Sequence, residues 1–140
     1  MNSIALIFSI TTIVMHILIF IIESLLWDVP VVIDKVLSKI DAPAGVSPID
    51  QAQILEVLFF NQGFYNLFVA LGGIAGLVLY GYGRIQEGIN LVCYVCFFAL
   101  GAGVVLASTT TAYPAAALQG IPPLIALIGL YSSNKQYANT

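Results

Sequence analysis

Between Gly88 and Asn134 the sequence contains no charged residue. A stretch of this length without charge has no surface suited to water, and charged residues make up only 8% of the whole chain. A soluble domain carries roughly 25% charged residues, so a soluble protein of this size would lack the polar surface that keeps it in solution. The chain is therefore expected to be an integral membrane protein whose solvent is mostly lipid.

Four apolar stretches are long enough to cross a bilayer, which takes about 20 residues in a helix. The last two are separated by "STTTAYP" (108–114), where hydroxyl side chains suited to helix caps precede a proline suited to a first helical turn. We therefore predict an all-α fold, an integral membrane bundle of four transmembrane helices in a single membrane domain over residues 1–140. The predicted spans cover about residues 3–27, 54–80, 89–108 and 114–131.

The longest connection, Asp28–Asp50, joins the first span to the second. Within it, "VVIDKVLSKI" (31–40) has the apolar spacing of a helix, because Val32, Val36 and Ile40 share one face and charged residues lie opposite. This pattern is typical of a short amphipathic helix that lies on the membrane surface between spans 1 and 2. The alternative is a plain polar loop.

The positively charged side chains do not decide which way the bundle faces. With four spans both termini lie on the same side, so the two lysines of the 28–50 connection lie opposite Arg84 and Lys135. Cytoplasmic loops usually carry an excess of Lys and Arg, and here the count is two against two.

The first span carries a stripe of polar side chains along one helical face. Two of them, His16 and Glu23, are ionisable, and an ionisable group at the bilayer centre costs roughly 2.5–3.5 kcal/mol on insertion scales. We therefore expect both to face protein rather than lipid. The stripe, at spacings of 3, 4, 7 and 4 residues, consists of Ser9, Thr12, His16, Glu23 and Trp27.

The second span begins with "FFNQGFYNLF" (59–68), in which three amides interrupt an apolar run. This span runs antiparallel to the first, so depths can be compared if Trp27 and Leu55 mark the same interface. On that assumption each ionisable residue of the first span lies near an amide of the second. The expected neighbours are His16 with Asn66, and Glu23 with Asn61 and Gln62.

The fourth span starts on the same side and carries Gln119 about five residues in. The pair Pro122–Pro123 lacks N–H groups, so the carbonyls of Leu118 and Gln119 lose their helical partners. Such carbonyls are tolerated in a membrane where they face protein or a wet cavity. We predict one polar cluster in the half of the bilayer nearest the 28–50 connection. The candidate ligand-binding residues are His16, Glu23, Trp27, Asn61, Gln62, Tyr65, Asn66 and Gln119.

Three segments together resemble the "domain of unknown function 1304" family of small bacterial membrane proteins: "MHILIFIIESLLW" (15–27), "NQGFYNLFVALG" (61–72) and "LQGIPPLIALIGL" (118–130). The 28–50 connection is longer than is usual in the family, and the third span departs most from its pattern. The resemblance implies a four-span architecture and a multi-pass protein of the cell membrane, the bacterial inner membrane, but it brings no established activity. The matching residues are His16, Glu23, Trp27, Asn61, Gln62, Gly63, Tyr65, Asn66, Gln119 and Pro122.

Two interpretations of the amides remain open. Either they hydrogen-bond across the spans and hold the bundle together, or they line a binding cavity with the ionisable groups.

The ionisable residues also have two interpretations each. Glu23 is either a protonation switch or paired near the surface, and His16 is either a core histidine bonded to Asn66 or a haem or metal ligand. Because this His has no Cys or carboxylate at its level, we expect no metal and no cofactor. Cys93 and Cys96 are interpreted as small buried hydrophobes.

Three functional hypotheses follow. The first is a small transporter or membrane ligand-binder for a cationic or amphipathic molecule, with Glu23 as the proton-linked group and Trp27 and Tyr65 as aromatic faces. The second is an accessory or structural subunit of a membrane assembly, and the third is an enzyme acting on a lipid with His16 and Glu23 as acid and base. The expected partners are membrane lipid, a small-molecule ligand and a second copy or larger membrane complex. A net charge of −3 without a basic cluster argues against nucleic acid.

Overall fold

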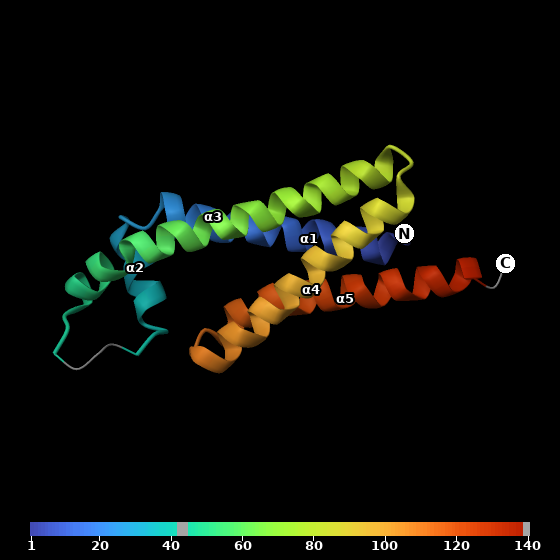
Figure 1. The fold of residues 1–140 in the computed structure, drawn as a ribbon. Helices are drawn as coiled ribbons and strands as arrows, with labels where there is room; N and C mark the ends of the chain where they lie inside the picture. Colours follow the sequence, from blue (N-terminus) through green and yellow to red (C-terminus); the bar gives the residue numbers. More distant parts are fainter. Residues whose placement is uncertain (42–44, 139–140) are drawn as a thin grey trace.

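The chain is all-helical in a computed structural model that describes residues 1–41 and 45–138, with side chains described up to Ser133. These residues contain no strand, which confirms the predicted fold class. The side chain of Lys135, used above in the count of positive charges, lies outside the described residues. The elements are α1 (Ser3–Phe20), η1 (Ile21–Leu25), α2 (Pro30–Leu37), α3 (Pro48–Gly81), α4 (Ile85–Thr109) and α5 (Tyr113–Ala138) (Figure 1).

Four of the described helical segments are long and apolar enough to cross a membrane. The start of α1 and the end of α5 lie at the same end of the bundle, as four spans require (Figure 1). The Met1 amine donates to the Tyr80 hydroxyl at 2.8 Å, and the Asn2 N–H donates to Ser133 Oγ at 3.1 Å. These bonds tie the start of the chain to α3 and α5. The candidate spans are Ser3–Leu25, Pro48–Gly81, Ile85–Thr109 and Tyr113–Ser133.

The helix α3 begins at Pro48, six residues before the start expected for the second span. The local signals for this start are in the sequence, because Ser47 caps the helix by accepting from the Asp50 N–H and Pro48 occupies the first turn. Its 34 residues extend for about 51 Å at 1.5 Å per residue. The helix is therefore longer than the roughly 30 Å hydrocarbon core, and part of it lies outside that core.

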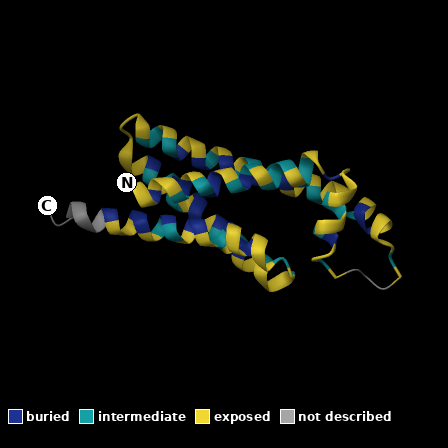
Figure 2. Cartoon of the chain, turned by 180° about the vertical axis from the view of Figure 1, so that it is seen from behind, coloured by how far each residue is buried: buried dark blue, intermediate teal, exposed yellow. Residues whose placement is uncertain are grey.

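The long helices approach closely where both contribute small residues. A Cβ placed on Gly88 would lie 2.6 Å from the Gly76 carbonyl oxygen, and a Cβ placed on Gly103 would lie 2.9 Å from the Gly120 Cα. Glycine at these points lets α3 pack on α4 and α4 pack on α5 with backbones in contact. The buried residues accordingly follow the inward sides of the helices, and the exposed residues lie on the outside (Figure 2).

The helices α3 and α4 lie close together near the turn that joins them and diverge toward the other end of the bundle (Figures 1 and 2). That other end carries α2 and the turn between α4 and α5. The two parts also touch there, since the Thr111 N–H donates to the Lys39 carbonyl at 3.1 Å. The candidate site lies in this wider half.

The helix expected in the 28–50 connection is confirmed as α2. Val32 and Val36 of the predicted apolar face are partly buried, but the helix ends at Leu37, so Ile40 falls beyond it. Leu37 packs with buried Trp27, and Ile33 and Val36 lie against the same cluster. The indole ring gives α2 an apolar surface within the protein, so the helix is anchored by packing.

Candidate functional site

A π-helical turn, η1, ends the first span. The hydrogen bond that defines this turn runs from the Leu26 N–H to the Ile21 carbonyl, five residues earlier, at 3.0 Å. Such turns are rare and are found mostly at functional sites, because the extra residue redirects side chains from the regular helical face. Glu23 lies at the centre of this turn.

The π-helical turn is held against α3 by two contacts. Ser24 Oγ donates to the Phe60 carbonyl at 2.9 Å, and it occupies the space where a Cβ on Gly63 would be. Three residues after Ser24, Trp27 Nε1 donates to the Ala52 carbonyl at 3.2 Å. Because both contacts are made to backbone atoms of α3, the position of η1 depends on the path of that helix.

Glu23 and Asn66 meet across η1 and α3. Asn66 Nδ2 donates to Glu23 Oε2 at 3.1 Å and to the Gln62 carbonyl at 3.0 Å. Asn66 is 5% exposed, and Glu23 is half-buried. The carboxylate therefore meets an amide about one turn deeper along α3 than the expected neighbours Asn61 and Gln62.

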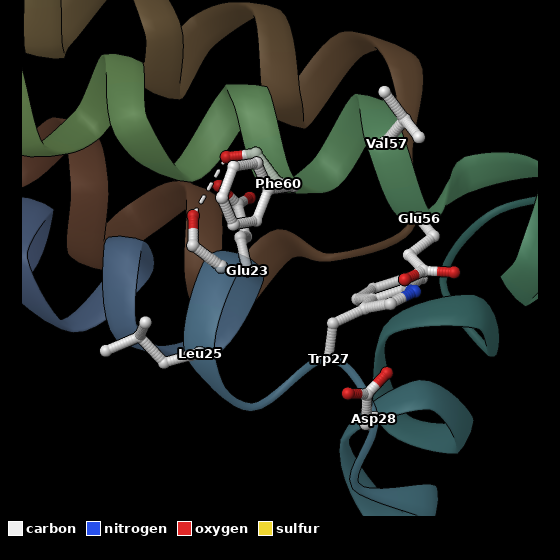
Figure 3. Close-up of a pocket in the computed structure, with 8 residues that line it drawn as sticks. Glu23, Leu25, Trp27, Asp28, Glu56, Val57 and Phe60 are labelled. Atoms are coloured by element: carbon white, nitrogen blue, oxygen red, sulfur yellow. Dashed lines mark hydrogen bonds between the residues drawn. The ribbon is translucent and has the colours of Figure 1, made fainter.

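On one side of this pair is an open pocket of about 380 Å³, called the acidic pocket here. Figure 3 shows the Trp27 ring between the carboxylates of Glu56, on α3, and Asp28. None of the described residues that line the pocket is Lys, Arg or His. The lining residues are Glu23, Ser24, Leu25, Trp27, Asp28, Glu56, Val57 and Phe60.

The three carboxylates of the acidic pocket do not converge on one point. Throughout the described part of the chain, no three His, Cys, Asp or Glu side chains are grouped so that they could hold a metal ion. The negative charge is instead distributed around an aromatic surface provided mainly by Phe60, which is 48% exposed, whereas Trp27 is buried and stacked on Phe59 at a centroid distance of 4.2 Å. Such a surface suits a bulky cation better than a compact one.

On the other side of the pair is a second pocket of about 340 Å³, called the amide groove here. It lies among α3, α4 and α5, where α3 and α4 diverge. Asn66 belongs to this groove, whereas Glu23 belongs to the acidic pocket, so their hydrogen bond links the two. The lining residues are Gln62, Tyr65, Asn66, Phe68, Phe98, Ala102 and Gln119.

Two of the predicted site residues line neither pocket. His16 is 1% exposed and lies 2.9 Å through Nδ1 from the Thr12 carbonyl, and Asn61 lies exposed on α3. A carbonyl oxygen only accepts, so Nδ1 carries a proton and the buried Nε2 has no partner among the described residues. The hydrogen bond expected between His16 and Asn66 is not formed, because Asn66 donates to Glu23 instead.

The remaining predicted residues are divided between the two pockets. Glu23 and Trp27 line the acidic pocket, and Gln62, Tyr65 and Asn66 line the amide groove together with Gln119. All of them were expected to lie in one cluster. They are divided because the acidic pocket lies between the end of the first span and α3, whereas the amide groove lies among α3, α4 and α5.

Over residues 10–131 the chain matches the family model described as "Protein of unknown function (DUF1304)". The chain belongs to this family. The DUF1304 match spans every residue that lines the acidic pocket and the amide groove. No curated protein and no solved structure matches the chain significantly. Membership of DUF1304 therefore supports the earlier resemblance but supplies no activity.

Within the region matched to DUF1304, sequence reasoning missed Glu56 and did not assign Asp28 to the site. Glu56 lies inside the stretch predicted as the second span, and a charged residue in a predicted span is itself a signal of function. Asp28 follows Trp27 directly, which places it at the mouth of the acidic pocket. Phe98 carried no such signal, since an apolar residue in an apolar helix is unremarkable.

Proposed function

We propose that this membrane protein binds a small amphipathic organic cation in the acidic pocket and transports it in exchange for a proton on Glu23. The observation that carries the proposal is the combination of three carboxylates with the exposed aromatic surface of one pocket and no lining cation. Carboxylates attract positive charge, and the exposed ring of Phe60 adds cation–π attraction. A pocket of about 380 Å³ falls within the range typical for small-molecule sites.

Glu23 is suited to exchange because its charge has little compensation within the protein. Among the described side chains, only the neutral amide of Asn66 donates to it. An ionised carboxylate removed from water needs a countercharge, and a neutral donor supplies only part of one. A proton and a ligand cation can each neutralise this group, and they compete for it. This competition would link ligand binding to proton release.

The contacts of His16 weigh against the alternative of a lipid-modifying enzyme. His16 and Glu23 line no common pocket, because the imidazole lies in the packed interior against Thr12. An acid and a base must both reach the substrate within hydrogen-bonding distance, directly or through one water. The accessory-subunit hypothesis has no particular contact in its favour and becomes an outcome of the experiment below.

The test is ligand binding by the detergent-purified protein, followed as the midpoint of thermal unfolding. The probes are tetraphenylphosphonium and the uncharged triphenylphosphine oxide, applied to wild type and to Glu23→Gln. Glu87→Gln is the matched control, because Glu87 is an exposed carboxylate paired with Arg84 at the other end of the bundle. We expect the cation to bind wild type and the control equally, and Glu23→Gln about tenfold more weakly.

Two results would contradict the proposal. One is an equal stabilisation of wild type and Glu23→Gln by the cation, which would remove Glu23 from the site. The other is the absence of any stabilisation by a wider panel of organic cations. In the second case, co-purification of a stoichiometric protein partner would favour the accessory-subunit hypothesis.

A further inference from the structure

We propose that the amide groove is a second, separate binding site, and that it takes the hydroxyl head group of a neutral single-chain lipid from the membrane. This proposal does not depend on cation binding in the acidic pocket. It rests on the unused hydrogen-bonding groups of the groove, on its lack of charge and on its position among diverging helices.

Two amide side chains of the groove, those of Gln62 and Gln119, have no hydrogen-bond partner among the described residues. Gln119 is 9% exposed, yet its side chain forms no hydrogen bond with the described residues. The side chains of Gln62 and Tyr65 likewise form none, and Asn66 uses only its Nδ2. Of the groups without a partner, Gln119 is buried, whereas Gln62 and Tyr65 are exposed on the helix surface, where hydrocarbon offers no water to compensate for the missing hydrogen bonds. A ligand that both donates and accepts would satisfy these groups.

The chemistry of the lining selects the head group. No lining residue of the groove is charged, in contrast to the acidic pocket. Amides offer one acceptor and two donor hydrogens each, and a hydroxyl group both donates and accepts. A head group with one or more hydroxyls therefore matches the groove, whereas an ionised head group would enter without a countercharge.

The apolar side of the groove selects the rest of the ligand. Phe68 on α3 and Phe98 on α4 are 60% and 47% exposed, and they flank the amides together with Ala102. Ala102 lies seven residues before the end of α4 at Thr109, or about 10 Å from that turn along the helix axis. This depth lies within the hydrocarbon region if the turn lies at its edge. A hydrocarbon chain between the two rings would extend directly into the lipid.

The size of the groove favours a lipid with one chain. A volume of about 340 Å³ accommodates a small head group and the first part of a chain, but the head group of a two-chain phospholipid carries charge and greater bulk. A monoacylglycerol has the required features, since its glycerol head group is neutral and carries two free hydroxyls.

The test measures lipid retention by native mass spectrometry of the detergent-purified protein. The probes are 1-monooleoylglycerol, methyl oleate with the same chain and no hydroxyl, and glycerol with no chain. We expect one monooleoylglycerol per protein chain, with methyl oleate and glycerol each bound at least about tenfold more weakly. Equal retention of methyl oleate would overturn the role of the amides. Equal retention of glycerol would overturn the assignment to a membrane lipid.

Gln119→Leu is the decisive variant, because Gln119 lines the groove and does not line the acidic pocket. Gln53→Leu is the matched control, since Gln53 is exposed on α3 and lines neither pocket. We expect Gln119→Leu to bind monooleoylglycerol about tenfold more weakly and Gln53→Leu to bind it as wild type does. If Gln119→Leu does not fold, Gln62→Leu replaces it, because Gln62 is exposed and lines the same groove. Unchanged retention in the folded groove variant contradicts the proposal.

Discussion

Asn66 Nδ2 donates to Glu23 Oε2 at 3.1 Å, and this hydrogen bond joins the wall of the acidic pocket to the wall of the amide groove. This contact joins the carboxylate of Glu23, in the first span, to the amide segment 59–68 of the second span. Asn66→Ala should therefore destabilise the protein by about 1–3 kcal/mol, because the half-buried Glu23 loses its donor.

The control for this prediction is Asn61→Ala, which removes the same amide from an exposed position on α3 that lines neither pocket. Asn61→Ala should change stability by less than about 0.5 kcal/mol. A double-mutant cycle with Glu23→Gln, measured by denaturant unfolding in detergent, isolates the pairwise coupling. Equal effects of the two alanine variants would show that the Glu23–Asn66 contact adds nothing to stability.

Gly63 is predicted to be essential for the docking of η1 on α3. In Gly63→Ala the added Cβ would overlap Ser24 Oγ, so the π-helical turn must move and the bond from Ser24 to the Phe60 carbonyl is lost. The expected loss is about 1–3 kcal/mol, the range for overpacked sites. The double variant Ser24→Ala/Gly63→Ala should regain part of that loss in thermal unfolding, since it removes the overlapping hydroxyl. No recovery would mean that the crowding comes from elsewhere.

Trp27 should contribute to stability in two separable ways. Trp27→Phe keeps an aromatic ring for stacking on Phe59 but loses the hydrogen bond to the Ala52 carbonyl, at a cost of about 1 kcal/mol. Trp27→Ala loses both and also removes the surface under α2, at a cost of about 3–5 kcal/mol. Chemical denaturation in detergent would measure both values. Similar losses in the two variants would contradict the packing role assigned to the ring.

His16 is predicted to be a structural residue with no part in either binding site. His16→Leu removes the hydrogen bond to Thr12 but also removes the buried Nε2, which has no partner among the described residues. The two effects oppose each other, so stability should change by no more than about 1 kcal/mol. Binding of tetraphenylphosphonium and monooleoylglycerol should remain at the wild-type level. A loss of binding in a stably folded His16→Leu protein would place His16 in a site after all.

The architecture was largely predictable because its signals are local. Apolar stretches of bilayer length gave the four long helices, and the hydroxyl–proline segment at 108–114 separated the last two. The helix in the 28–50 connection followed from periodicity, but its buried face depended on the position of Trp27 relative to α3. Contacts of that kind join residues distant in sequence, and periodicity alone does not specify them.

The candidate site was predictable in its residue types but not in its arrangement. A carboxylate in the first span and amides in the second indicated a polar contact, and Glu23 does meet an amide. It meets Asn66 rather than the expected Asn61 and Gln62, and it lies in a π-helical turn, Ile21–Leu25, that has no simple sequence signature. The division into two pockets depends on tertiary packing, since one pocket is lined by the end of the first span and α3 and the other by α3, α4 and α5.

The most direct test of the account is proton release on cation binding. Tetraphenylphosphonium is added to the purified protein in weak buffer with a pH indicator, over a series of starting pH values, for wild type, Glu23→Gln and Glu87→Gln. We predict that wild type and Glu87→Gln release up to one proton per bound cation, in the pH range where Glu23 is protonated before binding. Glu23→Gln should bind weakly and release none. Cation binding without proton release at every pH, or equal release by Glu23→Gln, would contradict the central claim that ligand and proton compete for Glu23.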